Sequence, residues 1–82
     1  MQSKNKKQKE YQIILNNLSN NLRKLRNEKN MSQIELSYEI GISSRTYQYL
    51  ESNSLTDIKF STIFKIADYY NISLDELIKI EK

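Results

Sequence analysis

Two short helical patterns, joined at the only glycine of this 82-residue chain, constrain its fold most strongly. SQIE at residues 32–35 is a capping box, in which a serine and a glutamate bind the free backbone N–H groups at a helix start. Leu36 and Ile40 follow at the four-residue spacing of an inward helix face. Gly41 comes next, where helices often end on a residue with positive φ, so we expect it to end a helix of about eight residues.

The run after Gly41 has the same organisation. Ser43 is predicted to cap a helix over about 44–52, whose inner side carries Tyr47 and Leu50. A helix, a tight glycine turn and a second helix are the core of the DNA-binding helix-turn-helix, in which the second helix enters the major groove. Glycine turns between helices are also common in proteins that bind no nucleic acid, so the motif alone leaves both interpretations open.

The rest of the chain adds three further helical patterns. A stripe with steps of three and four residues precedes the motif, at Tyr11, Leu15, Leu18, Leu22 and Leu25. A broad apolar face predicts a helix over about 60–70, and a second capping box at 73–76 predicts a last one. No stretch alternates long enough to predict a strand. The sequence therefore predicts an all-α fold, a compact five-helix domain over residues 11–82.

Composition removes several classes of function. The chain has no cysteine and no histidine, so disulfides, thiolate metal sites and the commonest general base are excluded. Its carboxylates show no catalytic spacing, and it has no glycine-rich phosphate loop. No apolar run reaches the roughly 18 residues of a membrane span, and no apolar segment follows the basic N-terminus. We expect a cytoplasmic protein that is not an enzyme, has no metal or cofactor and does not bind membranes.

Positive charge is concentrated in the first third of the chain. Residues 1–30 carry eight lysines and arginines against two glutamates, a net charge of +6, whereas residues 31–82 sum to −3. Residues 1–9 contain one apolar residue and four lysines, so we expect disorder there and a flexible basic arm over 1–10. The arm lysines would follow a DNA backbone or minor groove, or serve only as a solvated tail; they are Lys4, Lys6, Lys7 and Lys9.

Several motifs occur in one order over about residues 18–78: LRKLR at 22–26, MSQ at 31–33, GIS at 41–43, RTY at 45–47 and ISLDEL at 72–77. In combination they closely resemble the Cro/cI-type (Xre) helix-turn-helix family of phage and bacterial regulators. This resemblance implies a lambda-repressor-like DNA-binding domain. The chain departs from the family pattern at Ser37, usually alanine, and at Asn53, often glycine, and it lacks the proline common before the fourth helix. If Ser37 is buried, its hydroxyl must find a hydrogen-bond partner.

The resemblance implies a set of DNA-contacting residues: Gln33, Ser43, Ser44, Arg45, Thr46, Gln48 and Tyr49. Arg45 is the main candidate for reading a base, because arginine pairs bidentately with guanine; a phosphate contact or a plain surface role is the alternative. Gln48 would pair with adenine or remain solvated, and Gln33 would contact phosphate or be an ordinary polar first-turn residue. Ser43 would touch DNA or act only as a cap, while Tyr49 is balanced between surface and DNA contact.

Two further residues match the family as structural ones, since Arg26 and Glu51 stand where it has a partly buried ion pair between the first and third helices. The resemblance implies a sequence-specific double-stranded DNA-binding transcriptional regulator, and we expect a repressor. A homodimer formed by residues from about 72 onward would read a palindromic operator. The alternative is an antitoxin or a restriction–modification controller that also binds a protein partner.

Overall fold

The computed structural model describes residues 2–54 and 57–79, with side chains from residue 7, and over these ranges it contains helices and no strand. This confirms the predicted all-α class and its five-helix organisation. The helices are α1 (Gln2–Lys29), α2 (Gln33–Ile40), α3 (Ser44–Ser52), α4 (Phe60–Tyr70) and α5 (Leu74–Ile78).

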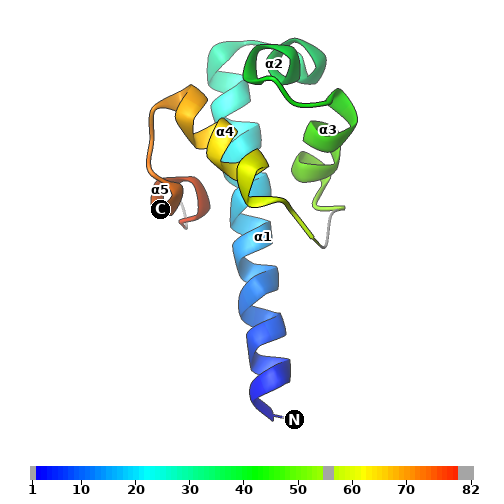
Figure 1. The fold of residues 1–82 in the computed structure, drawn as a ribbon, viewed down its shortest axis with the longest axis vertical. Helices are drawn as coiled ribbons and strands as arrows, with labels where there is room; N and C mark the ends of the chain where they lie inside the picture. The colour runs from blue at the N-terminus through cyan, green and yellow to red at the C-terminus, as the bar shows by residue number, and fades with distance from the viewer. Residues whose placement is uncertain (1, 55–56, 80–82) are drawn as a thin grey trace.

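The long helix α1 forms the axis of the molecule (Figure 1). Helices α3 and α5 pack against its C-terminal half, while α2 packs on α3 and α4 contacts both α2 and α5. The N-terminal half of α1 projects beyond the other helices, at the opposite end of the molecule from α2 (Figure 1). Along the predicted apolar stripe, burial accordingly increases from Tyr11, which is 42% exposed, to Leu22, which is fully buried.

The start of α1 differs from the sequence expectation. Residues 2–9 are helical in the structure, where we expected disorder, and the helix begins nine residues before Tyr11. This segment has no glycine or proline and is rich in lysine and glutamine, which are good helix formers. Adding such residues to an existing helix avoids the cost of nucleation. Independent motion of residues 1–10 as an arm stays a prediction.

The core lies between the five helices. It contains Leu18, Leu22, Leu36, Tyr47, Leu50, Ile66, Ala67 and Leu77, so every helix contributes at least one residue. Tyr47 is completely buried, as its place on the inner side of α3 predicted. Burial of this apolar surface is the main force that holds the short helices in place.

The helix ends follow the predicted capping pattern. At the start of α2, the Glu35 backbone N–H donates to the Ser32 hydroxyl and the Ser32 N–H donates to the Glu35 carboxylate, both at 3.0 Å. Gly41 has φ +92°, which confirms the positive φ expected there. Asn53 also has positive φ, +60°, so asparagine supplies the left-handed helix end where the family often has glycine.

Candidate nucleic-acid interface

The turn before α3 is held by the end of α2. The backbone N–H groups of Gly41 and Ile42 both donate to the carbonyl oxygen of Ser37, at 2.9 and 3.1 Å. Ser37 itself is buried, and its hydroxyl donates to the Ile34 carbonyl at 2.8 Å, so the serine in place of the family's alanine is satisfied. These bonds fix the direction in which the chain enters α3.

The outer face of α3 is defined by its buried face. Tyr47 and Leu50 point into the core, so the helical spacing turns Arg45, Gln48 and Tyr49 outward, and all three are exposed. Because the inward residues lie on one side of α3, the opposite, solvent-facing side carries a basic, an amide and an aromatic side chain together. This is the polar and aromatic composition that can contact base edges and sugars.

At the first turn of α3, Ser43 acts as the helix cap. Its hydroxyl oxygen accepts from the Thr46 backbone N–H at 3.0 Å, and its proton is donated to the Thr46 hydroxyl oxygen at 2.8 Å. The Ser43 hydroxyl thus donates one hydrogen bond and accepts another within the first turn of α3, which supports its capping role. Thr46 keeps its own hydroxyl proton and its methyl group, and Ser44 is partly exposed beside it.

Arg26 and Glu51 form a bidentate pair that joins α1 to α3. Arg26 Nε lies 2.7 Å from Glu51 Oε2, and its Nη2 lies 3.0 Å from Oε1. A third arginine N–H donates to the Met31 carbonyl at 2.9 Å, which ties in the loop before α2. Glu51 is only 3% exposed, so this ion pair places a charged group in the core beneath the outer face of α3.

Gln33 belongs to the same cluster. Its side-chain amide donates to Glu51 Oε1 at 2.9 Å, which connects the first turn of α2 to α3. Burial alone would raise the pKa of Glu51, but hydrogen bonds from Arg26, Tyr47 and Gln33 outweigh it and hold that pKa below its ordinary value. The Gln33 amide has a second N–H, which can still meet a phosphate at the N-terminus of α2.

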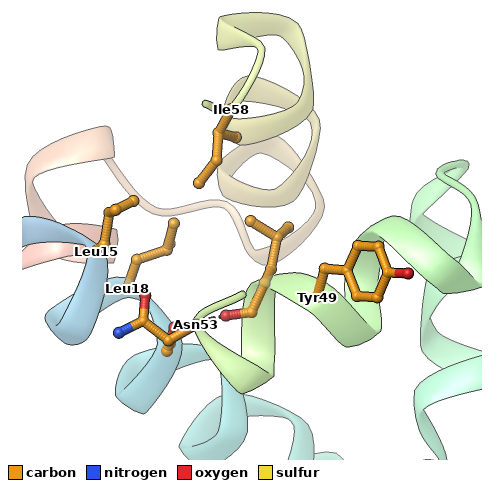
Figure 2. A pocket seen from close by; sticks show the side chains of 7 residues that line it. Leu15, Leu18, Tyr49, Asn53 and Ile58 are labelled. Carbon is orange, nitrogen blue, oxygen red and sulfur yellow. Dashed lines mark hydrogen bonds between the residues drawn. The ribbon is translucent and has the colours of Figure 1, made fainter. Parts of the chain in front are cut away.

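A tight apolar contact supports the far end of α3. Leu15 and Leu18 of α1, Leu50 of α3 and Ile58 before α4 line this contact. The Tyr49 ring points away from Leu15, Leu18 and Ile58 (Figure 2). The space between these residues has no room for a water molecule, so it supports packing and not ligand binding. Tyr49 is therefore presented by a well-packed helix end.

The arm lysines lie apart from this interface. The side chains of Lys7 and Lys9 are exposed on the projecting part of α1, whereas those of Lys4 and Lys6 lie outside the described side chains. This part of the helix is at the opposite end of the molecule from α2 (Figure 1). The structure thus brings together the residues on α2 and α3 that the sequence pointed to, but not the lysines.

The described part of the chain lacks two further classes of site. It holds no group of three histidine, cysteine, aspartate or glutamate side chains that could bind a metal ion. Among the same residues, no helix is both long and apolar enough to span a bilayer.

The capped helices, the left-handed turn at Gly41 and the outward residues of α3 define a helix-turn-helix domain. The family described as Helix-turn-helix (HTH_3) matches residues 22–77, more than half of the chain. The chain belongs to this Cro/cI-type, Xre-like family of DNA-binding regulators, whose members are generally not enzymes. Comparisons with curated proteins and with solved structures gave no match.

Proposed function

We propose that this protein is a transcriptional repressor that binds a palindromic double-stranded operator as a homodimer and acts in the cytoplasm. The observation that carries the proposal is the outer face of α3, where Arg45, Gln48 and Tyr49 are exposed together above a fully packed inner face. A helix fixed in this way can enter the major groove without losing its own packing. Repression follows if the occupied site overlaps a promoter, because bound protein then excludes the polymerase.

Each proposed contact follows from side-chain chemistry. Arg45 reads guanine through its two parallel N–H donors, and Gln48 pairs with adenine. Tyr49 stacks on a sugar or base, and Gln33 places its remaining N–H on a phosphate beside the free N–H groups of α2. Ser44 and Thr46, at the first turn of α3, contact phosphate, with the Thr46 methyl also suited to a thymine methyl.

The test is selection of bound sequences from random duplex DNA with the wild type and with Arg45→Ala. We expect the wild type to recover a palindrome, and the variant to lose preference at one position per half-site with about 10-fold weaker binding or more. Lys65→Ala is the matched control, because Lys65 is an exposed cation on α4, away from α3. Selection that yields no preferred sequence, or a preference that Arg45→Ala leaves intact, would contradict the proposed reading residues.

A second candidate function is supported by one surface feature of α2. Tyr38 is 87% exposed and lies one helical turn from Ile34, which is also exposed. Large exposed apolar pairs are typical of protein contact sites. An antitoxin or a restriction–modification controller would use such a pair to bind a protein partner while α3 binds DNA. In that case Tyr38→Asp would abolish partner binding and leave the selected DNA sequence unchanged.

A further inference from the structure

The projecting part of α1 carries apolar side chains beyond the family domain. We define the α1 extension as residues 2–14, all of which precede the start of the family match at residue 22. On it, Lys7, Tyr11 and Ile14 follow one another at helical spacing on one side of the helix, and Tyr11 is 42% exposed. Apolar surface removed from water stabilises a protein, so a partner that covers these side chains would stabilise the extension.

A second apolar surface lies beside the extension. We define the α4–α5 face as Phe60, Phe64 and Asp68 of α4 with Asp75 and Ile78 of α5. Phe60 is 69% exposed and Phe64 is 54% exposed, which is unusual for two phenylalanines one turn apart. An apolar groove connects the extension to Ile78 of this face; it is lined by Tyr11, Ile14, Leu15, Leu18, Ile58, Ile63 and Ile78.

The α4–α5 face points away from the DNA-reading helices. Tyr69 donates a hydrogen bond to Glu39 of α2, which marks the side of α4 that faces the helix-turn-helix. Phe60 and Phe64 are about 140° to 180° around the same helix from Tyr69 at 100° per residue. A partner on this face therefore leaves the outer face of α3 open to DNA.

The net charges of the two surfaces indicate which partner covers the α4–α5 face. The extension carries four lysines and one glutamate, a net charge of +3, whereas residues 60–78 carry one lysine and three carboxylates, a net charge of −2. Lys7 lies one turn before Tyr11, and Asp68 lies one turn after Phe64, so each apolar surface has a charged residue of opposite sign at its edge. The two surfaces on one chain are thus complementary in both polarity and charge.

We propose that the α1 extension of one copy docks on the α4–α5 face of a second copy, and that the same contact forms in the reverse direction. Since every chain carries both surfaces, a two-fold pair makes two identical contacts and leaves neither surface uncovered. This inference rests on the proposed function, for which it supplies the two-fold symmetry that a palindrome requires. It places the main contact on α1 and α4, in addition to the residues from about 72 onward expected from the sequence.

Oligomeric state without DNA tests the pair directly. We expect sedimentation of the full chain at micromolar concentration to show a dimer, and Tyr11→Asp to weaken its self-association by about 100-fold, since the change enters the two-fold interface twice. Asn27→Asp is the control, because it introduces the same charge at an exposed residue of α1 that lies outside both surfaces. Circular dichroism checks that both variants keep their helix content.

Charge reversal gives a test that does not depend on loss of a contact. Lys7→Glu alone and Asp68→Lys/Asp75→Lys alone should each dissociate the dimer, whereas an equal mixture of the two should form a heterodimer with both contacts restored. A monomeric wild-type chain, an unaffected Tyr11→Asp dimer, or a mixture that stays monomeric would overturn the inference. Binding of the same proteins to a single half-site tests the proposed function separately, because one domain reads one half-site without the partner.

Discussion

At the scale of single residues, Gly41 shows why one position needs one residue type. A Cβ built on Gly41 would meet no atom within 4 Å, so space is not the reason for glycine. The reason is its φ of +92°, which L-residues with side chains rarely adopt. The same requirement is met by asparagine at the ends of α1, α3 and α4, where Asn30, Asn53 and Asn71 have φ values of 56° to 60°.

Gly41→Ala should therefore destabilise the fold through the backbone alone. We expect a loss of about 1–2 kcal/mol in the free energy of unfolding, measured by urea denaturation. The opposite substitution, Asn71→Gly, should be neutral or slightly stabilising, because glycine adopts the left-handed conformation without strain. A neutral Gly41→Ala would show that the turn can change its φ, and positive φ would then not explain the glycine.

At the scale of helices, α1 holds the ends of its neighbours through polar side chains. The buried Asn21 amide donates to the carbonyl oxygens of Leu77 and Lys79, both at 2.8 Å, at the end of α5. Ser19 donates to the Leu50 carbonyl at 2.5 Å and so binds the last turn of α3. The carbonyls at the end of α5 are thus satisfied by α1, whereas the Leu50 carbonyl also accepts from the Asn53 backbone N–H at 3.3 Å.

Asn21→Ala should loosen α5 in particular. Removing the amide leaves two carbonyls at the end of a five-residue helix without this donor, so we expect a loss of about 1–3 kcal/mol of stability. Amide hydrogen exchange should speed up over 74–78 more than over α3. Asn27→Ala, an exposed asparagine later on α1, is the control and should change neither quantity. Equal acceleration in α3 and α5 would instead indicate general unfolding.

The helices and their caps could be predicted because the signals are local. Serine caps, the glycine turn and the spacing of Tyr47 and Leu50 depend on neighbours within a few residues. The burial of Asn21 could not be predicted this way, because asparagine reads as a surface residue and its partners are more than 50 residues away in the chain. The outward set on α3 followed from the buried set, whereas the bond from Gln33 to Glu51 depends on how α2 and α3 pack.

At the scale of the whole molecule, one buried carboxylate joins three helices. Glu51 of α3 receives hydrogen bonds from Arg26 of α1 and Gln33 of α2, and its pKa is lowered although burial opposes this. A carboxyl with a lowered pKa in the folded state stabilises the fold above its unfolded pKa. That contribution is lost as the pH falls below the ordinary glutamate value and through the folded one.

The wild type should therefore lose stability as the pH is lowered from about 5 towards 3, and Glu51→Gln should show a shallower loss. At pH 7 the variant should be less stable by about 3–5 kcal/mol, since Arg26 is left without its charge partner. Urea denaturation across this pH range measures both effects. Glu28→Gln, an exposed carboxyl on α1, is the control. Parallel pH curves for the wild type and Glu51→Gln would mean that another carboxyl governs acid unfolding.

Helix α1 runs unbroken from the projecting segment to the contacts beneath α2 and α3, in a molecule whose longest dimension is 43 Å. In the proposed pair, this continuous helix fixes the distance between the docking surface and the DNA-contacting helix α3. The distance between the two α3 helices of the pair is then set by a rigid helix and not by a flexible linker. One extra base pair between half-sites would turn the second half-site by about 35° around the duplex. Because α1 is rigid, the second α3 helix cannot reorient to follow this rotation.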